Sequence, residues 1–379
     1  MQFVQGITYS KSKDESKNKT NIRILTASNI SLEKTKIDLT EEKYLKENFK
    51  INKDKILKKE DIFICTSSGS IKHLGKSCFI EKNFEHAYFG GFCGVIRNTK
   101  QNIIDNKYLF AMLNTKYFEN YKYLFVSQNI NNLNGNNLLK FKIPLPPLEI
   151  QKQIISDIEE IEQQEEKANE VIKENEENIK NIINTLNAKN FNLLKLENLM
   201  NIVRGASPRP IQNYITKNKE GINWIKIGDV KEDDKYITST KQRIIKKGIL
   251  KSRYVSKGDF ILSNSMSSGR PYILKIDGCV HDGWLIFKDI DISLNKDYLY
   301  QILISDKIQA QLINKSKGSV VNNLNIDRVK TLKIPLPPIS DQQKILKQIE
   351  PLEKEIEDSK NYLAKVKEEK QNILDKYLK

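Results

Sequence analysis

The sequence predicts an α+β fold in which two tandem mixed α/β modules are separated by two long antiparallel coiled-coil helices, the whole being internally duplicated. One observation is a repeat: residues 131–162 and 322–353 share 15 of 32 aligned positions at an offset of 191 residues. A second is the Lys-Ile-Pro-Leu-Pro-Pro run in each copy, and a third is the heptad pattern that follows it. A period this long excludes a solenoid, so each copy is a whole module with its trailing helix.

The proline run separates each module from its helix. Proline lacks an amide donor and restricts the residue before it, so residues 143–147 and 334–338 are predicted to be extended. Apolar residues then alternate at spacings of four and three over about four or five heptads, which favours a coiled coil. The first seam comprises Ile154, Ile158, Ile161, Ala168, Ile172, Ile179, Ile182 and Leu186, with Glu165 and Asn175 as interruptions. The second comprises Ile345, Ile349, Leu352, Ile356, Leu363, Val366, Ile373 and Tyr377, with Ser359 and Lys370 as interruptions.

Connectivity predicts how these parts are arranged. The first helix must end where the second module begins, so packing the two seams antiparallel returns the chain to its start. At about 1.5 Å per residue, each helix would be about 60 Å long. We expect modules at residues 1–148 and 191–338 and helices at 149–190 and 339–379. Pro351 lies deep in the second helix, where proline costs about 3 kcal/mol or causes a kink, so we expect that helix to restart there.

The two modules show the same order of elements. Strands are predicted at 22–25 and 61–65 and again at 223–227 and 258–262, each second strand being followed by a polar loop. A helix follows at 107–123 in the first module and at 297–303 in the second. Residues 90–94, Gly-Gly-Phe-Cys-Gly, predict a short turn between strands. Residues 195–199 have no counterpart before Met1, so we expect either a chain that starts short or a missing leading segment.

The charge is distributed unevenly along the chain. The formal net charge is +15, yet residues 149–190 contain 11 acidic and 5 basic residues and residues 339–379 contain 9 of each. The modules therefore carry more than the whole excess of positive charge, the pattern expected of a polyanion-binding surface. A Lys- and Asn-rich composition could also reflect codon usage, but codon usage alone does not explain the uneven partition.

Motifs for catalysis, metal binding and membrane insertion are weak or missing in the sequence. The four cysteines form no CxxC pair and there are only three histidines, so we expect no metal site. No run approaches the roughly 18 apolar residues of a membrane span, and the first residues lack the apolar core of a signal peptide, so we expect a cytoplasmic protein. The Asn- or Asp-Pro-Pro-aromatic tetrapeptide of adenine methyltransferases does not occur. We expect a chain without a catalytic site.

The duplicated module, proline run and helix together resemble the specificity (S) subunit of type I restriction–modification systems over essentially the whole chain. The resemblance rests on residues 143–147, Gln151 and Ile154 and on residues 334–338, Gln342 and Ile345. It implies that each module is a target recognition domain that reads one half of a split sequence in double-stranded DNA, while the helices set the gap. It also implies no cofactor on this chain, two modification subunits that use S-adenosylmethionine, and restriction subunits that use ATP. The start at Met1 and the proline at 351 depart from the family pattern.

Candidate DNA-binding residues are those whose side chains can hold phosphates or read base edges. Arg270 is the strongest candidate for base reading, because a guanidinium can bind guanine with two hydrogen bonds. Asp229 could accept from cytosine N4. Serines beside glycine also close turns, so a purely structural role is the alternative for each loop residue. The full set is Ser67, Ser68, Ser70, Lys72, Lys76, Arg204, Arg209, Lys226, Asn264, Ser265, Ser267, Ser268 and Arg270.

Two other functions fit parts of the same pattern. A stand-alone bipartite DNA-binding protein, such as a repressor, would use the modules without enzyme partners. A helical protein-docking scaffold would use the long helices, with the basic charge incidental. A methylation mark that depends on this gene would separate the three hypotheses.

Overall fold

The computed structural model describes residues 1–31, 36–126, 131–188, 191–231, 234–264, 269–314, 324 and 326–378. The chain forms two compact units, one made of Met1–Ala168 with Asn361–Lys379 and the other of Asn169–Lys360. Each unit contains one module and part of both long helices. The division crosses the helices, so the expected boundaries at 148, 190 and 338 stay predictions.

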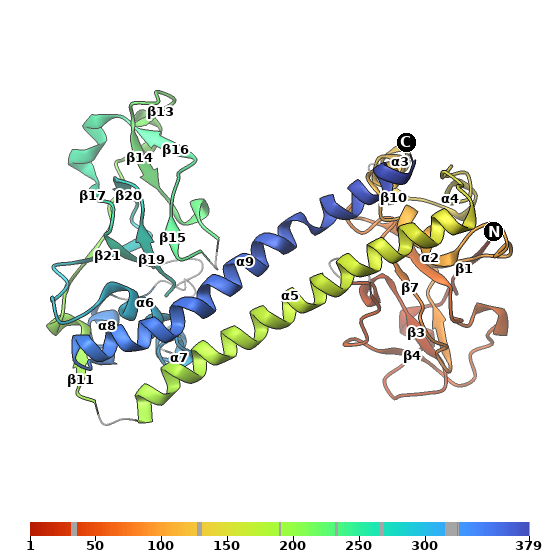
Figure 1. The fold of residues 1–379 in the computed structure, drawn as a ribbon, viewed down its shortest axis with the longest axis horizontal. Coiled ribbons are helices and arrows are strands. Elements are labelled where there is room, and N and C mark those ends of the chain that lie inside the picture. The colour runs from red at the N-terminus through yellow and green to blue at the C-terminus, as the bar shows by residue number, and fades with distance from the viewer. Residues whose placement is uncertain are drawn as a thin grey trace. The chain divides into compact units, whose positions relative to one another are not determined.

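The first unit contains two four-stranded sheets and a small two-stranded ribbon (Figure 1). Alternate residues of β5 point to opposite faces, as in any strand: Phe63 packs between the sheets, whereas Ile62 and Ile64 pack with the helices. The main sheet has the order β1 (Gln2–Gln5), β9 (Cys93–Arg97), β5 (Ile62–Cys65), β7 (Ser77–Phe79). The second sheet has the order β2 (Glu15–Ser16), β4 (Lys43–Leu45), β3 (Arg23–Leu25), β8 (Ala87–Phe89), and the ribbon pairs β6 (Ser67–Ser68) with β10 (Asn131–Asn132).

The second unit repeats the strand order of both sheets and adds one edge strand to each, so the duplication predicted from the sequence extends to the sheets. Its two-stranded ribbon joins other segments than the ribbon of the first unit. The second sheet of each unit contains the same parallel pair of strands, β3 with β8 in the first unit and β14 with β20 in the second. The main sheet has the order β12 (Asn201–Arg204), β21 (Trp284–Lys288), β18 (Phe260–Ser263), β19 (Pro271–Leu274), β15 (Tyr236–Ile237). The second has β13 (Ile215–Thr216), β16 (Gln242–Ile244), β14 (Ile222–Ile225), β20 (Gly278–Val280), β17 (Arg253–Val255), and β11 (Leu193–Lys195) pairs with β22 (Lys333–Pro335).

The single helix expected at residues 107–123 is wrong: the chain forms two helices there. The first ends at Met112, and Thr115 starts the second, because its hydroxyl accepts a hydrogen bond from Phe118 N at 3.2 Å and so acts as an N-cap. The second unit has a similar break at Ser305. The short helices are α1 (Lys11–Asp14), α2 (Asn106–Met112), α3 (Lys116–Lys122), α4 (Gly135–Leu138), α6 (Lys296–Ile304), α7 (Asp306–Asn314) and α8 (Ile326–Lys330).

The two long helices are α5 (Leu148–Ala188) and α9 (Ile339–Leu378). The expected restart at Pro351 is also wrong, because α9 is one helix through that residue. Pro351 is exposed, and its missing amide removes one bond to the carbonyl four residues earlier. Exposure offsets part of this cost, since water can satisfy the released carbonyl.

Within each unit, α5 and α9 run in opposite directions and their seams meet (Figure 1). In the first unit Lys370, an interruption of the second seam, donates to Glu165, an interruption of the first, at 3.0 Å. In the second unit Asn175, which is buried, donates to Glu355 at 2.8 Å. Polar groups that break the apolar pattern thus find partners on the facing helix, which is the arrangement that fixes register in coiled coils.

A buried glutamine joins the first module to its helix. Gln151 is 0% exposed, and its Oε1 accepts from Asp105 N at 2.8 Å. Its Nε2 donates to Ile103 O at 3.0 Å and to Pro146 O at 2.7 Å. The side-chain amide therefore connects α5, the proline run and the turn before α2, and uses both of its donors.

Gln342 makes the same three bonds in the second unit and is also 0% exposed. Its Oε1 accepts from Asn295 N at 2.9 Å, and its Nε2 donates to Ser293 O at 2.7 Å and Pro337 O at 2.8 Å. We call each glutamine with its three partners the glutamine clasp. The repeated glutamine four residues after the proline run is thus explained by a structural bond that each module needs.

A buried tyrosine supports each clasp from the module side. Tyr108 Oη donates to Pro144 O at 3.0 Å, and Tyr298 Oη donates to Pro335 O at 3.0 Å. Burial raises the pKa of Tyr108 to about 12 and raises the pKa of Tyr298 as well. Both hydroxyls therefore stay protonated and able to donate near neutral pH.

The clasp predicts a large difference between two neighbouring glutamines of α9. Gln342→Ala should lower the free energy of unfolding by about 3 kcal/mol, because buried donors and acceptors in the second unit lose their partner. Gln343→Ala is the matched control: its side chain is exposed, and we expect a change within about 0.5 kcal/mol. Urea unfolding followed by circular dichroism measures both, and equal midpoints for the two variants would contradict the clasp.

Candidate nucleic-acid interface

The repeated Asn-Asn-Leu-Asn segment holds the polar loop that follows the central strand of each main sheet. In the first module Leu133 N donates to Thr66 O at 2.8 Å, and Asn131 Nδ2 donates to Ser68 O at 3.1 Å. In the second module Leu324 N donates to Asn264 O at 2.9 Å. Within the described residues, Leu133 and its repeat counterpart Leu324 therefore bind the backbone at the start of this loop in both halves.

The candidate residues of the first loop fall into an exposed and a half-buried group. Ser70 and Lys72 are exposed, whereas Ser67 and Ser68 are half-buried in β6. Ser67 Oγ lies 3.3 Å from Asn132 Oδ1 of β10. The loop thus presents hydroxyl and amide groups together, the chemistry that reads base edges. Their contact with DNA stays a prediction.

Lys76 has a structural partner inside the first module. Its Nζ donates to Ile30 O at 3.0 Å, and burial lowers the pKa of its amine. This bond ties the end of the polar loop to the segment after β3. The predicted role of Lys76 in DNA binding would require that bond to be exchanged for a phosphate.

A tight turn beside this loop is built alike in both modules. Cys93 N donates to Gly90 O at 2.8 Å, which confirms the turn predicted at residues 90–94, and Trp284 N donates to His281 O at 3.2 Å. Thr66 N donates to Phe92 O at 2.9 Å, as Asn264 N donates to Gly283 O at 2.7 Å. We call residues 90–93 and 281–284 the apex turns. Each apex turn is fixed by its module's polar loop.

The end of the first strand of each main sheet also binds the apex turn. Gln5 Nε2 donates to Gly91 O, and Arg204 Nε donates to Asp282 O at 2.8 Å. These are the same position of the turn, so Gln5 and Arg204 are structural equivalents. The predicted residue Arg204 therefore lies at the apex turn of the second module.

The Asp282 carboxylate contacts two further side chains at that turn. Its carboxylate accepts from Ser207 Oγ at 2.6 Å and lies 3.5 Å from Arg209 Nη2. The bond from Ser207 is the main reason that the pKa of Asp282 lies below its usual range. The charged carboxylate thus holds Arg209, which keeps 81% of its side chain exposed and can reach a phosphate or a base.

Lys226 and Asp229 stand beside the same turn. The Asp229 carboxylate accepts from Lys226 N at 2.8 Å and Lys241 N at 3.2 Å, so it caps a turn of the backbone. Asn29 does the same for Thr26 N in the first module, at 2.9 Å. A cap that recurs in both halves gives Asp229 a structural role, and its predicted contact with cytosine stays a prediction.

The remaining candidates belong to the loop after β18. Asn264 is buried, and Arg270 is half-buried with its N–H donating to Ser263 Oγ at 2.9 Å. Ser265, Ser267 and Ser268 lie outside the described residues. The structure thus brings Arg204, Arg209 and Asn264 to one apex turn, and it leaves the base-reading role of Arg270 a prediction.

Two residues that matter here were missed in the sequence. Asp282 organises the second apex turn, and Phe92 projects from the first with 68% of its surface exposed. The offset of 191 residues aligns 90–93 with 281–284, so the repeat gives the correspondence between the two turns once it is extended this far. The two segments share no identical residue, so pattern matching alone could not find them.

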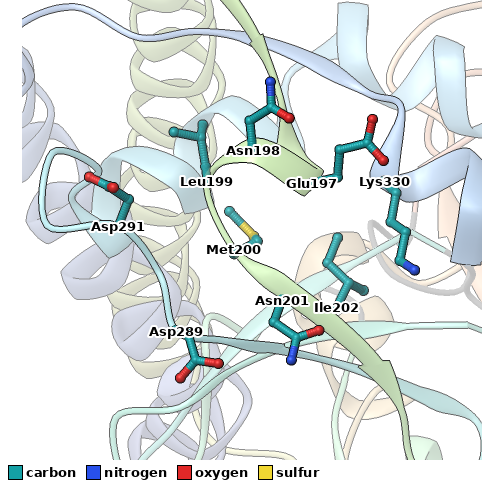
Figure 2. A pocket seen from close by; sticks show the side chains of 9 residues that line it. All are labelled: Glu197, Asn198, Leu199, Met200, Asn201, Ile202, Asp289, Asp291 and Lys330. Atoms are coloured by element: carbon teal, nitrogen blue, oxygen red, sulfur yellow. The ribbon is translucent and has the colours of Figure 1, made fainter.

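A pocket of about 390 Å³ lies away from these loops, in the second unit (Figure 2). Three carboxylates line it, those of Glu197, Asp289 and Asp291, against the single cation Lys330. That balance disfavours a phosphate, so the pocket is a poor site for the DNA backbone.

Metal ligands and membrane-spanning segments were sought in the described part of the chain. There, no three His, Cys, Asp or Glu side chains gather as metal ligands. No helix among these residues is long and apolar enough to span a bilayer.

Comparison with known sequences gives matches over both halves. The family model for the type I restriction modification DNA specificity domain matches residues 3–176 and 188–368. The EcoKI specificity subunit of Escherichia coli is 30% identical over 158 residues, which are 41% of this chain and 33% of that protein. The chain thus matches about a third of that relative's length. The putative MjaX specificity subunit of Methanocaldococcus jannaschii is 23% identical over 375 residues, covering 90% of this chain and 83% of that protein.

Comparison with solved structures concerns the fold. The type I restriction–modification S subunit from M. genitalium has a TM-score of 0.56 at 14% identity, covering all of this chain and 93% of that one. A chain from a study of assembly and conformational transition of the type I R-M system has a TM-score of 0.58 at 18% identity, covering 94% and 91%. These likenesses confirm the fold class predicted from the sequence.

The apex turn of the second module predicts a pH dependence of stability. Burial lowers the pKa of His281, whose Nδ1 accepts from Gly283 N at 2.6 Å; Asp282, Asp229 and Lys226 are the charges that act on the ring. The unfolded chain takes up the proton near pH 6.5, before the folded chain does. Stability from His281 is therefore present above pH 6.5 and is lost as the pH falls below it.

Lowering the pH from 7.5 to 5.5 should lower the urea midpoint more in the parent chain than in His281→Gln, which has no titrating group at position 281. The difference between the two chains isolates His281 from the other histidines. A variant that loses as much stability as the parent over this range would contradict the assignment.

Proposed function

Because the chain belongs to the family of type I restriction modification DNA specificity domains, we propose that it is the sequence-specific DNA-binding subunit of a type I restriction–modification complex. In this proposal each module reads one half of a bipartite site in double-stranded DNA. The observation that carries it is a duplicated set of bonds. In each module the repeated segment, through Leu133 or Leu324, binds the backbone of Thr66 or Asn264 at the start of the polar loop, and that residue in turn binds the apex turn.

The charge and chemistry of these surfaces support DNA as the ligand. The chain has a formal net charge of +15, while the sequences of the two long helices are acidic or neutral. Lys and Arg attract the phosphate backbone, and hydroxyl, amide and guanidinium groups of the loops are suited to base edges. The exposed Arg209 guanidinium, held by Asp282, has both properties.

We propose that the chemistry belongs to partner subunits. Two modification subunits would bind S-adenosylmethionine and methylate adenine, and restriction subunits would use ATP, while this chain binds no cofactor and supplies no catalytic group. The proposal fits a chain whose polar clusters are largely occupied with structural hydrogen bonds, such as those of Gln151, Asp229 and Gln342.

Adenine methylation in the host tests the function directly. Deleting the gene should abolish methylation at one bipartite motif, and restoring the gene should restore it, as read by single-molecule sequencing of the genome. An unchanged methylation pattern, with the modification subunits expressed, would contradict the proposal. Specific binding of the purified chain to DNA without any methylation mark would instead favour a stand-alone DNA-binding protein.

The helices should set the gap between the two half-sites. Removing residues 166–172 together with 361–367 takes one heptad from each helix and keeps the contacts Glu165–Lys370 and Asn175–Glu355. Seven residues are about 10.5 Å of helix, or about 3 base pairs at about 3.4 Å each. We expect a methylated motif with the same two halves and a gap shorter by about 3 base pairs.

Deleting residues 166–172 alone is the matched control for this experiment. It puts the seams out of register, so methylation should be lost and no new spacing should appear. If the double deletion methylates with the original gap, the helices do not set the spacing.

A further inference from the structure

Phe92 is a large aromatic side chain displayed on the surface of the first module. It occupies the third position of the apex turn, and 68% of its surface is exposed. A ring exposed to this extent forgoes most of the hydrophobic stabilisation that burial would give it. An isolated exposed aromatic needs no explanation by itself, so the case rests on how this one is held and what surrounds it.

The backbone beneath Phe92 is fixed from three sides. Its carbonyl accepts from Thr66 N at 2.9 Å and from Ser67 N at 3.1 Å. The turn is closed by the bond from Cys93 N to Gly90 O at 2.8 Å, and Gln5 holds the carbonyl of Gly91. Because the backbone of the turn is fixed in this way, it loses little further freedom when the ring meets a ligand, which favours binding.

The surroundings of Phe92 match a nucleic-acid groove. Ser67, whose backbone N–H binds the Phe92 carbonyl, belongs to the polar loop, and its Oγ lies 3.3 Å from Oδ1 of Asn132 on the neighbouring strand β10. Gly90 and Gly91 precede it and carry no side chain, so the turn can come close to a partner surface. The ring therefore stands among groups that can hydrogen-bond to base edges.

The second module is built differently at the same point. Gly283 occupies the position of Phe92, with the equivalent bond from Asn264 N to its carbonyl at 2.7 Å. Its neighbour Asp282 contacts Arg209 through its carboxylate, whereas the equivalent residue of the first module is Gly91, which has no side chain. One frame thus presents an apolar ring in the first module and a guanidinium in the second, which are two different chemistries for reading bases.

We infer that the Phe92 ring contacts the C5-methyl group of a thymine in the half-site read by the first module, and so helps to determine which sequence that module accepts. Apolar side chains, Phe among them, recognise the thymine methyl in the major groove. The inference rests on the proposed function and adds a specific residue and a specific base to it. Arg209 would take the corresponding position in the other half-site.

The test replaces the gene in its host with Phe92→Ala, Phe92→Leu or the control Tyr117→Ala, and sequences methylated adenines. Phe92→Ala should relax one A·T position of one half-site, while the other half-site is unchanged. Sites that carry another base pair at that position should be methylated at least about fivefold more than in the parent. Phe92→Leu keeps an apolar contact and should relax the position less. Tyr117 is 63% exposed and belongs to α3, not to the apex turn or the polar loop, so its variant should keep the parent motif.

A second arm needs no mutant and removes only the methyl group. In a synthetic duplex carrying the motif, each thymine of the first half-site is replaced in turn by uracil, and binding by the chain assembled with its modification subunits is measured. One replacement should weaken binding about fourfold, since a buried methyl contributes about 0.8 kcal/mol. The same replacement should have no effect on the Phe92→Ala complex.

The outcomes separate this inference from the function on which it rests. A gene-dependent motif that is identical in the parent and Phe92→Ala would overturn the inference and leave the function standing. Insensitivity of the parent complex to every uracil would overturn the thymine contact, even if Phe92→Ala relaxes the motif. Absence of any gene-dependent motif would overturn the proposed function and the inference together.

Discussion

The glutamine clasp is the constraint on which the rest of the structure depends. Gln151 and Gln342 are fully buried, and each amide joins a long helix, a proline run and a module loop through three hydrogen bonds. A buried amide without these partners would destabilise its unit, so the clasp enforces one way of joining module to helix. The proline run fits the same logic, because its prolines have no N–H that must find an acceptor, while their carbonyls accept hydrogen bonds from the glutamine and the tyrosine.

The helix seam is separate from the polar loop and the apex turn in each unit, and this separation is the physical basis of the proposed function. Along the seam, Glu165 meets Lys370 and Asn175 meets Glu355, so polar interruptions specify register while the apolar residues supply stability. The polar loops and apex turns lie on the modules and share none of these bonds. Substitution at an apex turn, as between Phe92 and Gly283, can therefore change the surface of a module without disturbing these helix contacts, and in the proposed function this is where base preference would change.

The sequence predicted the features that depend on periodicity and repetition, and it failed where tertiary contacts decide. The heptads and the proline runs predicted α5, α9 and their antiparallel pairing. The break at Thr115 was missed because one hydroxyl cap decides it, and α9 passes through Pro351 because that residue is exposed. The apex turns escaped notice because their backbone is shared while their residues differ. Lys76 and Asp229 show the reverse case, in which residue types suited to DNA are bound within the module.

The central claim is that the chain consists of two copies of one reading unit, each carrying its own specificity. The most direct measurement replaces residues 201–329 with residues 2–138, which gives a chain with two first modules on unchanged helices. In the second unit Gln342 then meets the inserted copies of Ile103 and Asp105, the partners that Gln151 has in the first unit. Sequencing of adenine methylation in a host carrying this chain should show a symmetric motif made of the first half-site twice, with the original gap. A motif that still contains the second half-site, or one with an altered gap, would contradict the account.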